Sequence, residues 1–360
     1  MKIIVIGGGI AGISIAAELS RTHQVTLLEM EPQLAHHTSG RSAAMYLGSY
    51  GDLNVQALTG ESFDIYFELS HEYGHPLLTP RDMVQILDHD QLSELDETLA
   101  KHPAMKIMPV DDLMKMAPYI NPDIVGAVLH DASGYDIEVA GLHQTYVRRF
   151  TANKGVIEKS NEVTEITFNS TGTSTVRTPS QTLHADLIVN ASGAWGNFIA
   201  ERAQCSTIPL TPLRRTIFTS KLSQPFEPGP LVLRHPEEFY FRVDRGTVLG
   251  SPADETPSVP CDAHPEEIDV AMAIEAINDF TTLNIRSVES TWAGLRTFTS
   301  DRSPAMGSNI DQPNFFWFCG QGGYGIQMAP KLATLAADVI NNTVKVADAN
   351  LVSALSPRRF

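Results

Sequence analysis

The sequence predicts an α/β fold in which a nucleotide-binding domain carries an inserted domain of antiparallel strands. Three observations predict it. The first thirty residues alternate strand, glycine turn, helix and strand; short β-rich runs fill the middle of the chain; and a second glycine-rich turn precedes a long helix near the C-terminus. The 360 residues are enough for about two domains of roughly 150 residues each.

The composition indicates a folded protein and argues against a nucleic-acid partner. Hydrophobic residues make up 42% of the chain and charged residues 19%, so a sizeable core can form. The 26 basic and 42 acidic residues give a net charge of −16, which repels a phosphate backbone. Cys205, Cys261 and Cys319 are widely spaced, which predicts neither a disulfide framework nor a zinc site. We therefore expect a cytoplasmic protein with no metal and no transmembrane segment, since no apolar run reaches the ~18 residues of a membrane span.

The N-terminal strand–turn–helix–strand unit predicts a dinucleotide-binding site. Lys2 to Ile6 is short, β-branched and apolar, residues 13–21 favour a helix, and residues 24–28 read as a second strand. The turn after the first strand fits G-x-G-x-x-G. Strand, glycines and helix in this order are typical of a site that holds a pyrophosphate at the helix N-terminus.

Each part of this turn has a physical task. Gly7 permits the tight turn, Gly9 lets the backbone approach a pyrophosphate, and Gly12 lets the helix pack close to the strand. Glu29 follows the second strand, about 20 residues past the first glycine, where a ribose hydroxyl needs an acceptor. An acid at this place favours an unphosphorylated adenosine ribose, and it leaves both NAD and FAD open as cofactors.

The later elements follow from hydrophobic spacing and from glycine or proline breaks. Phe63, Tyr66, Phe67 and Leu69 recur at helical spacing, whereas residues 163–168 alternate as a strand does. In chain order we expect a helix start at 41–45, helices within 61–73 and 91–118, strand-like sequence at 76–88, strands at 163–168 and 186–190, an antiparallel block within 210–250, a helix at 268–280, a strand at 314–319, and a glycine turn at 320–325 before a helix at 326–341.

These elements predict a discontinuous nucleotide-binding domain assembled from both chain ends and the middle. We assign to it residues 1–75, 131–208 and 292–360. Residues 76–130 and 209–291 are assigned to the inserted domain, which would bind the substrate.

Several motifs together resemble those of the FAD-dependent amino acid oxidase and dehydrogenase family (the DAO family), which includes D-amino acid oxidase, glycine oxidase and sarcosine oxidase. The resemblance covers essentially the whole chain. Its carriers are the G-x-G-x-x-G unit, Ser-Gly-Arg-Ser-Ala-Ala at 39–44, Asn-Ala-Ser-Gly-Ala-Trp at 190–195, Trp-Ala-Gly-Leu-Arg at 292–296 and Gly-Gln-Gly-Gly-Tyr-Gly-Ile-Gln at 320–327. A closer likeness, to the D-arginine dehydrogenase branch, is carried by Arg214-Arg215, Phe239-Tyr240 and the segments 41–44, 249–253 and 355–359.

The resemblance implies a Rossmann-like FAD-binding domain of the glutathione-reductase type with an inserted antiparallel-sheet substrate domain. It implies FAD as a non-covalent cofactor, because Gly294 stands where sarcosine-oxidase relatives attach their flavin to a cysteine. The glycine turn at 320–325 opens a helix whose N–H groups and positive dipole end suit the negative charge of a reduced flavin. The implied cofactor-binding residues are Gly7, Gly9, Ala11, Gly12, Glu29, Ser39, Arg41, Ser42, Ala43, Ala44, Val163, Ala191, Ser192, Gly193, Trp195, Gly320, Gly322, Gly323, Tyr324, Gly325, Ile326 and Gln327.

On the substrate side, the resemblance implies an amino acid held by its carboxylate. Arg215 and Arg296 match the two clamp positions, Tyr240 matches a phenol on the same carboxylate, and Tyr50 matches a tyrosine that closes the site over the flavin. Arginine suits the clamp because its fork pairs both carboxylate oxygens and it stays charged. Hydride transfer from Cα to flavin N5 would give an imino acid, which hydrolyses to a 2-oxo acid and ammonia.

The side-chain pocket is expected to involve Met45, Asp82 and Val84. The D-arginine dehydrogenase branch has a histidine where this chain has Met45, and an acid near 80–84 reads the basic side chain of its substrate. Asp82 could serve as that acid, whereas Val84 at the same place would leave the pocket apolar.

The sequence thus predicts an FAD-dependent D-amino acid dehydrogenase whose electron acceptor is a quinone, a dye or oxygen. A glycine or sarcosine oxidase with a small pocket is the alternative within the family. An NAD-dependent dehydrogenase gives the second glycine turn no role, and a nucleotide-binding module without catalysis gives Arg215, Arg296 and Tyr240 none.

We predict that acid precipitation of the purified protein releases the flavin. The expected result is a colourless pellet and a yellow supernatant, because Gly294 offers no nucleophile for a covalent bond. Flavin absorbance that stays with the pellet would contradict this prediction.

Overall fold

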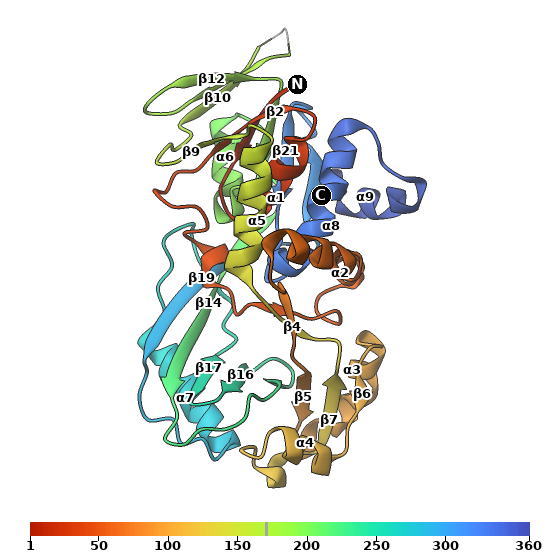
Figure 1. Cartoon of the computed structure of the whole chain (residues 1–360), viewed down its shortest axis with the longest axis vertical. Helices are drawn as coiled ribbons and strands as arrows, with labels where there is room; N and C mark the ends of the chain where they lie inside the picture. Colours follow the sequence, from red (N-terminus) through yellow and green to blue (C-terminus); the bar gives the residue numbers. More distant parts are fainter. Residues whose placement is uncertain (170–171) are drawn as a thin grey trace.

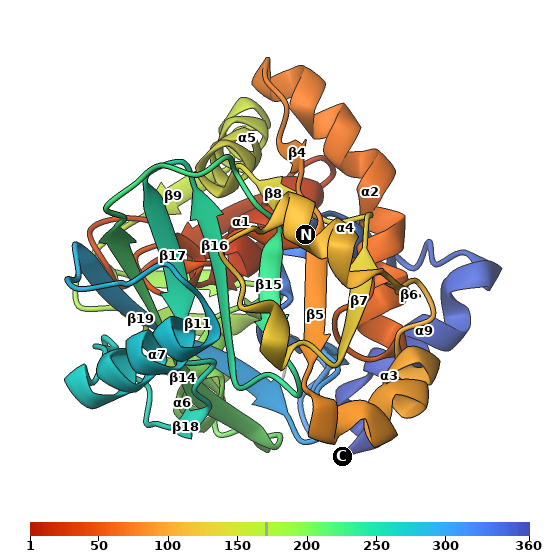
Figure 2. The ribbon, with the colours of Figure 1, turned by 90° about the horizontal axis from the view of Figure 1, so that it is seen from below.

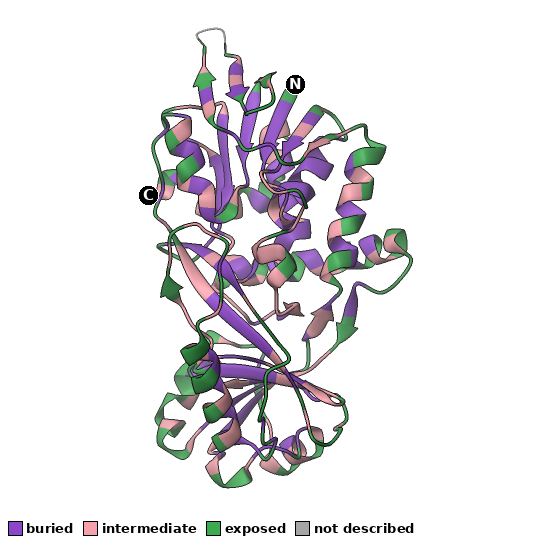
Figure 3. Cartoon of the chain, turned by 90° about the vertical axis from the view of Figure 1, so that its left-hand side faces the viewer, coloured by how far each residue is buried: buried purple, intermediate pink, exposed green. Residues whose placement is uncertain are grey.

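The structure, a computed structural model, describes residues 1–169 and 172–360 of the chain. Two β-rich halves are stacked along the long axis of the molecule (Figure 1). The upper half contains a mostly parallel sheet between helices, and the lower half contains a mostly antiparallel sheet. Buried residues concentrate in the strands of both sheets and on the helix faces that touch them (Figure 3). The predicted α/β fold with an inserted antiparallel sheet is confirmed.

The upper sheet is built around the N-terminal strand β1 (Lys2–Ile6). Its four Ile and Val residues are buried, as expected of a strand covered by helices on both faces. The strand order is β20-β21-β13-β1-β2-β9, with parallel pairs throughout except for the antiparallel pair β20–β21. The other strands are β2 (Gln24–Leu28), β9 (Val156–Glu158), β13 (Leu187–Asn190), β20 (Ala305–Ser308) and β21 (Phe315–Cys319).

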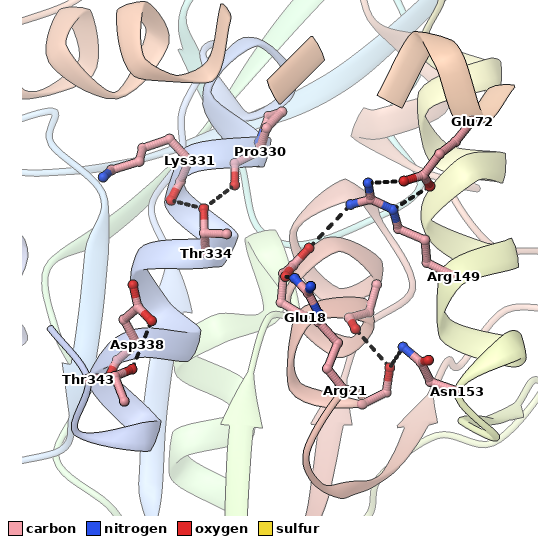
Figure 4. Close-up of polar contacts among 12 residues, drawn as sticks. Glu18, Arg21, Glu72, Arg149, Asn153, Pro330, Lys331, Thr334, Asp338 and Thr343 are labelled. Carbon is pink, nitrogen blue, oxygen red and sulfur yellow. Dashed lines mark hydrogen bonds and ion pairs between the residues drawn. The ribbon is translucent and has the colours of Figure 1, made fainter. Parts of the chain in front are cut away.

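The helices of the upper half pack on one another as well as on the sheet. Arg149 ties three of them together: its guanidinium donates to Glu72 at 2.6 Å and lies 3.4 Å from Glu18 (Figure 4). Figure 4 also shows Thr334 bonded within its own helix, to the carbonyl groups of Pro330 and Lys331. The helices are α1 (Ile10–Leu19), α2 (Leu53–Tyr73), α5 (Val139–Ala152), α6 (Gly196–Arg202), α8 (Gly325–Asn341) and α9 (Ala349–Leu355).

The lower sheet has two faces with different roles, and Figure 2 shows its strands side by side. On one face, a core that includes Val84 and Phe241 packs against α4 and α7. On the other face, Met83 and Tyr240 pack towards the upper half. The strands are β5 (Met83–Leu87), β6 (Lys106–Ile107), β7 (Ala127–Asp131), β14 (Leu210–Lys221), β15 (Leu231–Arg234), β16 (Phe239–Asp244), β17 (Thr247–Ser251), β18 (Thr256–Pro257) and β19 (Ser290–Thr299), with helices α3 (Leu95–Lys101), α4 (Val110–Met116) and α7 (Glu267–Phe280).

Smaller elements complete the chain. One antiparallel sheet joins β3 (Met45–Tyr46), β8 (Tyr135–Ile137) and β4 (Leu78–Pro80), and a second joins β10 (Glu165–Phe168), β11 (Ser174–Arg177) and β12 (Thr182–Ala185). Short 3₁₀ helices are η1 (Thr38–Arg41), η2 (His89–Glu94), η3 (Pro122–Ile124), η4 (Gly193–Trp195), η5 (Val346–Asp348) and η6 (Pro357–Arg359).

Two element predictions are wrong. No helix starts at 41–45 in the described chain, because Ser42 is extended and Ala44 has a positive φ of 62° before β3 begins. The single helical region expected at 91–118 is broken into η2, α3, β6 and α4. Pro103 and Pro109 explain the breaks, since the residue before a proline is disfavoured in a helix.

The expected domain boundaries stay a prediction. The cuts at 76 and 209 fall between elements, and the cut at 131 falls at the last residue of β7. The cut at 292 falls inside β19, which pairs with β14 from Leu210–Thr299 to Thr219–Ser290.

In the described residues, the helices are either too short or too polar to cross a membrane.

We predict that Gly12→Ala lowers the free energy of unfolding by about 2–3 kcal/mol, because an added Cβ would lie 1.8 Å from the carbonyl oxygen of Gly7. Chemical denaturation measures this change. The matched control is Gly60→Ala in α2, where nothing lies within 4 Å of the added Cβ and the better helix former is expected to stabilise by about 0.5–1 kcal/mol. Equal effects of the two substitutions would contradict the close helix–strand approach.

Candidate functional site

A long cavity opens at the carboxyl ends of the parallel strands of the upper sheet. Its volume is about 1480 Å³, part of it open to solvent. Residues that directly follow the strands line it, namely Gly7 after β1, Glu29 after β2, Ala191 after β13 and Gly320 after β21. Ligands of open α/β sheets bind at this edge, because the loops and helix N-termini converge there.

The first glycine turn forms one wall of the cavity with its backbone. Gly7 has a φ of 105°, which a residue with a side chain rarely adopts. α1 begins directly behind this turn with Gly9 as a cap that has no side chain, so backbone N–H groups face the cavity. The carboxylate of Glu29 accepts from the N–H groups of Gly8 at 2.6 Å and Glu31 at 2.8 Å, which fixes it at the cavity wall. This cradle fits a pyrophosphate and a ribose.

A second wall comes from the segment that contains η1. Ser39 Oγ accepts from the Ile10 N–H at 2.9 Å, which ties this segment to the start of α1. Arg41 donates to the carbonyl oxygens of Ala263 and Ala293, each at 2.9 Å, and so connects the two halves of the molecule. Its guanidinium therefore has a structural task beside the cavity that it lines.

The far end of the cavity is closed by the glycine turn between β21 and α8. Gly320 and Gly322 have positive φ values of 70° and 53°. The N-terminus of α8 points its unpaired N–H groups and positive dipole end at this part of the cavity. A Cβ on Gly323 would come within 3.0 Å of Arg296 Nη1, so the turn also makes room for that guanidinium.

Most of the residues predicted to bind the cofactor line this one cavity. They are Gly7, Gly9, Ala11, Glu29, Ser39, Arg41, Ser42, Ala43, Val163, Ala191, Ser192, Gly193, Trp195, Gly320, Gly322, Gly323, Gly325 and Ile326.

Four other residues predicted to bind the cofactor are not among those that line this cavity, and their contact with the cofactor stays a prediction. Gly12 packs α1 onto Gly7, and Ala44 donates from its N–H to Ser42 Oγ at 3.0 Å. Gln327 is buried, where it donates to Thr59 Oγ1 at 2.9 Å and bonds both backbone groups of Leu47. Tyr324 packs its ring on Tyr50 and Phe298.

Two arginines reach the same cavity from the lower sheet. Arg215 lies on β14 opposite Gly294 of β19, and Arg296 lies on β19 opposite Leu213. The two side chains are therefore diagonal neighbours on one face of an antiparallel pair, close enough to hold one ligand between them. Gly294, with no side chain, leaves the space beside Arg215 open to the cavity.

The charges around the two arginines are unequally balanced. Arg215 is paired with Glu237 at 3.2 Å and with Glu255 at 3.3 Å. Arg296 has no carboxylate partner among the described residues, and its Nη1 donates only to the Tyr50 hydroxyl at 3.4 Å. Burial opposes the charge of Arg296, but the neighbouring phenols of Tyr240 and Tyr50 and the Glu237 carboxylate raise its pKa above the usual value. The site thus contains one charged guanidinium, that of Arg296, without a carboxylate partner in the described chain.

Two further polar atoms at this point have no hydrogen-bond partner in the described part of the chain. They are Arg215 Nε and the Tyr240 hydroxyl, both buried. The Arg215 guanidinium carbon lies 5.9 Å from the centre of the Tyr240 ring. Buried polar groups are rarely left unpaired, so their convergence points to a polar ligand.

A family model described as FAD dependent oxidoreductase (DAO) matches residues 2–339 of the chain. The chain belongs to the DAO family of FAD-dependent oxidoreductases. FAD is therefore its cofactor, and the glycine cradle, Glu29 and the α8 N-terminus fit the pyrophosphate, ribose and flavin of that molecule.

Individual relatives are distant in sequence and close in fold. FAD-dependent oxidoreductase domain-containing protein 1 of Xenopus laevis is 24% identical over 94% of this chain and 78% of its own length, and sarcosine oxidase subunit beta of Arthrobacter sp. is 23% identical over 94% and 87%. The solved L-proline dehydrogenase of P. horikoshii superposes with a TM-score of 0.87 at 20% identity, covering 100% of this chain and 97% of that one. Glycine oxidase of Geobacillus kaustophilus gives 0.86 at 18% identity, covering 99% and 98%.

The loop that carries Tyr50 is held by several hydrogen bonds, and the position of Tyr50 over the flavin stays a prediction. Ser49 Oγ donates to the buried Asp131 carboxylate at 2.6 Å, and His102 Nδ1 lies 2.8 Å from the Ser49 carbonyl oxygen. The Tyr50 hydroxyl donates to Glu237 Oε1 at 3.1 Å. Burial, followed by the charge of Glu237, raises the pKa of Tyr50 well above the usual value, so the phenol stays a hydrogen-bond donor.

The side-chain pocket differs from the expectation at Asp82 and Val84. The carboxylate of Asp82 pairs with His130 at 2.9 Å, and Val84 is fully buried in the core beneath α4 and α7. The prediction for Val84 is corrected, because alternation along β5 turns Met83, not Val84, to the face that carries Tyr240, whereas the role of Asp82 stays a prediction. Met45 lies in that same cluster, with its sulfur 3.4 Å from Arg242 Nη1.

The sequence reasoning missed Glu237, Glu255 and Arg302. Glu255 bonds Arg302 as well as Arg215, and burial works against its charge, but Arg302, Arg215 and Arg296 lower its pKa. These residues lie in the β15–β16 turn, the segment after β17 and the loop after β19, which meet only in the fold. No local pattern marks them.

Two other groups beside the FAD cavity have simpler accounts. Burial raises the pKa of the Cys319 thiol to about 12, and its Sγ lies 3.1 Å from the Asn190 carbonyl oxygen, so it is not a ready nucleophile. Glu31, His36 and His37 bring three groups able to bind a metal within 4.8 Å of one another. The bond of 3.1 Å between His37 and Glu31 and the packing of His37 on Trp195 account for that proximity.

We predict that Ser49→Ala lowers the free energy of unfolding by about 1.5–3 kcal/mol, since it removes a buried hydrogen bond to the charged Asp131. Denaturation of the FAD-loaded protein measures this change. The matched control is Ser353→Ala on the exposed side of α9, for which we expect almost no effect. A change at Ser49 no larger than that at Ser353 would show that the bond does not anchor the Tyr50 loop.

Proposed function

We propose that the protein is an FAD-dependent dehydrogenase or oxidase that breaks the Cα–H bond of an amino acid and forms an imino acid. The broader statement, that it is an FAD oxidoreductase of a family acting on amino-acid-like CH–NH substrates, follows from the family. The observation that carries the finer proposal is the Arg296 guanidinium. It is charged, has no carboxylate partner in the described chain, and lies diagonal to Arg215 in the FAD cavity.

The arrangement suits a carboxylate better than a neutral alcohol. Arg296 and the Arg215 guanidinium offer two forks, and the Tyr240 hydroxyl is an unpaired donor beside them. Such groups bind the two oxygens of one carboxylate and fix the direction of its Cα–H bond. Tyr50, kept as a neutral donor by its raised pKa, is hydrogen-bonded to both Glu237 and Arg296 beside them.

When bound, FAD accepts the two electrons and the α-hydrogen of the substrate. The described residues near the clamp contribute orientation and charge rather than acid–base groups. The imino acid that results reacts with water to give a 2-oxo acid and ammonia.

The cluster of apolar residues beside the two arginines supports a substrate with an apolar side chain. Met45, Met83 and Leu249 belong to the cluster that contains Tyr240, and Arg242 lies at its edge. Arg242 is itself paired with Asp136 and Asp244, and Asp82 is paired with His130, so these three carboxylates already have partners. We therefore propose a D-amino acid with an apolar side chain, where the D preference rests on the resemblance to the D-amino acid oxidising branches.

The relatives support the amino-acid class. Structures of similar fold are named as glycine oxidase, L-proline dehydrogenase and iminodiacetate oxidase, whose named substrates each carry a carboxylate and an amine. Others, such as glycerol 3-phosphate dehydrogenase of Caloramator mitchellensis, act on a phosphate ester. The experiment below separates the two classes.

The test is anaerobic mixing of the FAD-loaded protein with D- and L-amino acids, glycine, sarcosine and glycerol 3-phosphate, followed at the flavin band near ~450 nm. We expect bleaching by D-leucine or D-methionine and none by glycerol 3-phosphate. Bleaching by glycine or sarcosine alone would replace the proposal with the small-substrate oxidase. Reoxidation by air, compared with a quinone or a dye, then identifies the electron acceptor.

We further predict that Arg296→Lys lowers kcat/KM by about 100-fold, because a lysine ammonium cannot pair both carboxylate oxygens. Steady-state kinetics with the best substrate measure the loss. The matched control is Arg286→Lys, an exposed arginine bonded only to Asn284 in the described chain, with unchanged kinetics expected. Equal kinetics of the two variants would remove Arg296 from the clamp.

A further inference from the structure

We propose that the Glu237 carboxylate occupies the substrate-carboxylate position of the free enzyme, so that substrate binds by displacing it. This inference rests on the proposed function, and it assigns Glu237 the role of a residue that sets affinity and selectivity. Glu237 belongs to none of the motifs that carry the family resemblance.

The contacts of one oxygen atom carry the inference. Glu237 Oε1 accepts from Arg215 Nη1 at 3.2 Å and from the Tyr50 hydroxyl at 3.1 Å. The same hydroxyl accepts from Arg296 Nη1 at 3.4 Å. A carboxylate oxygen thus already lies where the arginines and the closing tyrosine meet. A substrate carboxylate that uses these donors must take them from Glu237.

The backbone at Glu237 gives independent support. Glu237 has a φ of 126°, in the region that favours glycine. Residues with side chains adopt such a conformation only where the surrounding structure holds them, and these positions gather at ligand sites. Here the turn between β15 and β16 aims the carboxylate at Arg215, and Tyr240 follows three residues later on β16.

Exposure and charge make displacement feasible. The Glu237 side chain is 32% exposed, whereas that of Arg215 is 3% exposed, so the glutamate can move towards solvent while the arginine stays in place. Arg215 then keeps Glu255, which is also held by Arg302, as a partner. When the Glu237 carboxylate moves away, the clamp loses one negative charge, and the substrate carboxylate replaces it.

This arrangement predicts which ligands bind. Only a ligand whose own carboxylate replaces Glu237 on Arg215 and Tyr50 gains the full set of hydrogen bonds. An amine without a carboxylate leaves Glu237 in place. The apparent association constant for a carboxylate is the intrinsic constant multiplied by the fraction of free enzyme in which Glu237 has left this position.

The probes are acetate and propionate, unreactive monocarboxylates, titrated into the FAD-loaded enzyme and followed by the change in flavin absorbance. Glu237→Gln removes the charge, and Glu237→Asp keeps the charge but shortens the side chain by one methylene. We expect both variants to bind the probes about 10-fold more tightly than the unmodified enzyme. KM for the amino acid substrate is expected to fall with little change in kcat.

The matched control is Glu238→Gln, the neighbouring exposed residue, whose carboxylate lies 3.8 Å from Arg234 and outside the clamp. Its probe affinity is expected to stay unchanged. Weaker or unchanged binding in both Glu237 variants would overturn the inference, as would tightening in Glu237→Gln alone, which indicates a general charge effect without occupancy.

The probe titration needs no turnover, so the inference and the proposed function fail separately. If amino acids bleach the flavin and the Glu237 variants bind the probes no better, the inference is wrong and the function stands. If the variants bind the probes more tightly but no amino acid bleaches the flavin, Glu237 does occupy a carboxylate position, and the proposed substrate class is wrong.

Discussion

The site depends above all on the pairing of β14 with β19. This antiparallel pair reaches from the lower sheet to the FAD cavity and sets Arg215 and Arg296 diagonally on one face. Its register also places Gly294 opposite Arg215, and a Cβ added at Gly294 would lie 3.4 Å from Thr38 Cα. A slip of one of these strands by one residue would turn its arginine to the opposite face and separate the two guanidinium groups. The placement of the two arginines on one face therefore depends on the register of β14 and β19.

The charges of the site follow from this geometry. Glu237 and Glu255 both pair with Arg215, so their combined charge falls on one side of the clamp, whereas Arg296 has no carboxylate partner in the described chain and donates to the Tyr50 hydroxyl. Burying a charged arginine without a carboxylate is costly unless a ligand supplies one. The same imbalance explains why the amino-acid carboxylate and the Glu237 carboxylate compete for one position.

Elements that are determined by residues close together in the sequence could be predicted. β1, the turn at Gly7 and α1 follow each other directly (Figure 1), and the φ of Gly7 and the close approach of Gly12 to the Gly7 carbonyl give these two glycines a steric reason. The helix predicted at 41–45 failed, because Ala44 adopts a left-handed conformation that tertiary contacts impose. The pocket prediction at Val84 failed for a related reason, since strand alternation turned Met83 rather than Val84 to the face that carries Tyr240.

The sequence by itself determined the fold class, indicated FAD through its motifs, and singled out Arg215 and Arg296 as the proposed clamp. Glycine spacing, helix N-termini and short motifs encode these locally, within a few residues of the atoms that they place. Only the tertiary structure decided which carboxylates surround the clamp, because Glu237, Glu255 and Arg302 come from separate segments that meet in space. The net charge around the two arginines depends on all of these neighbours together, and the neighbours lie far apart in the sequence.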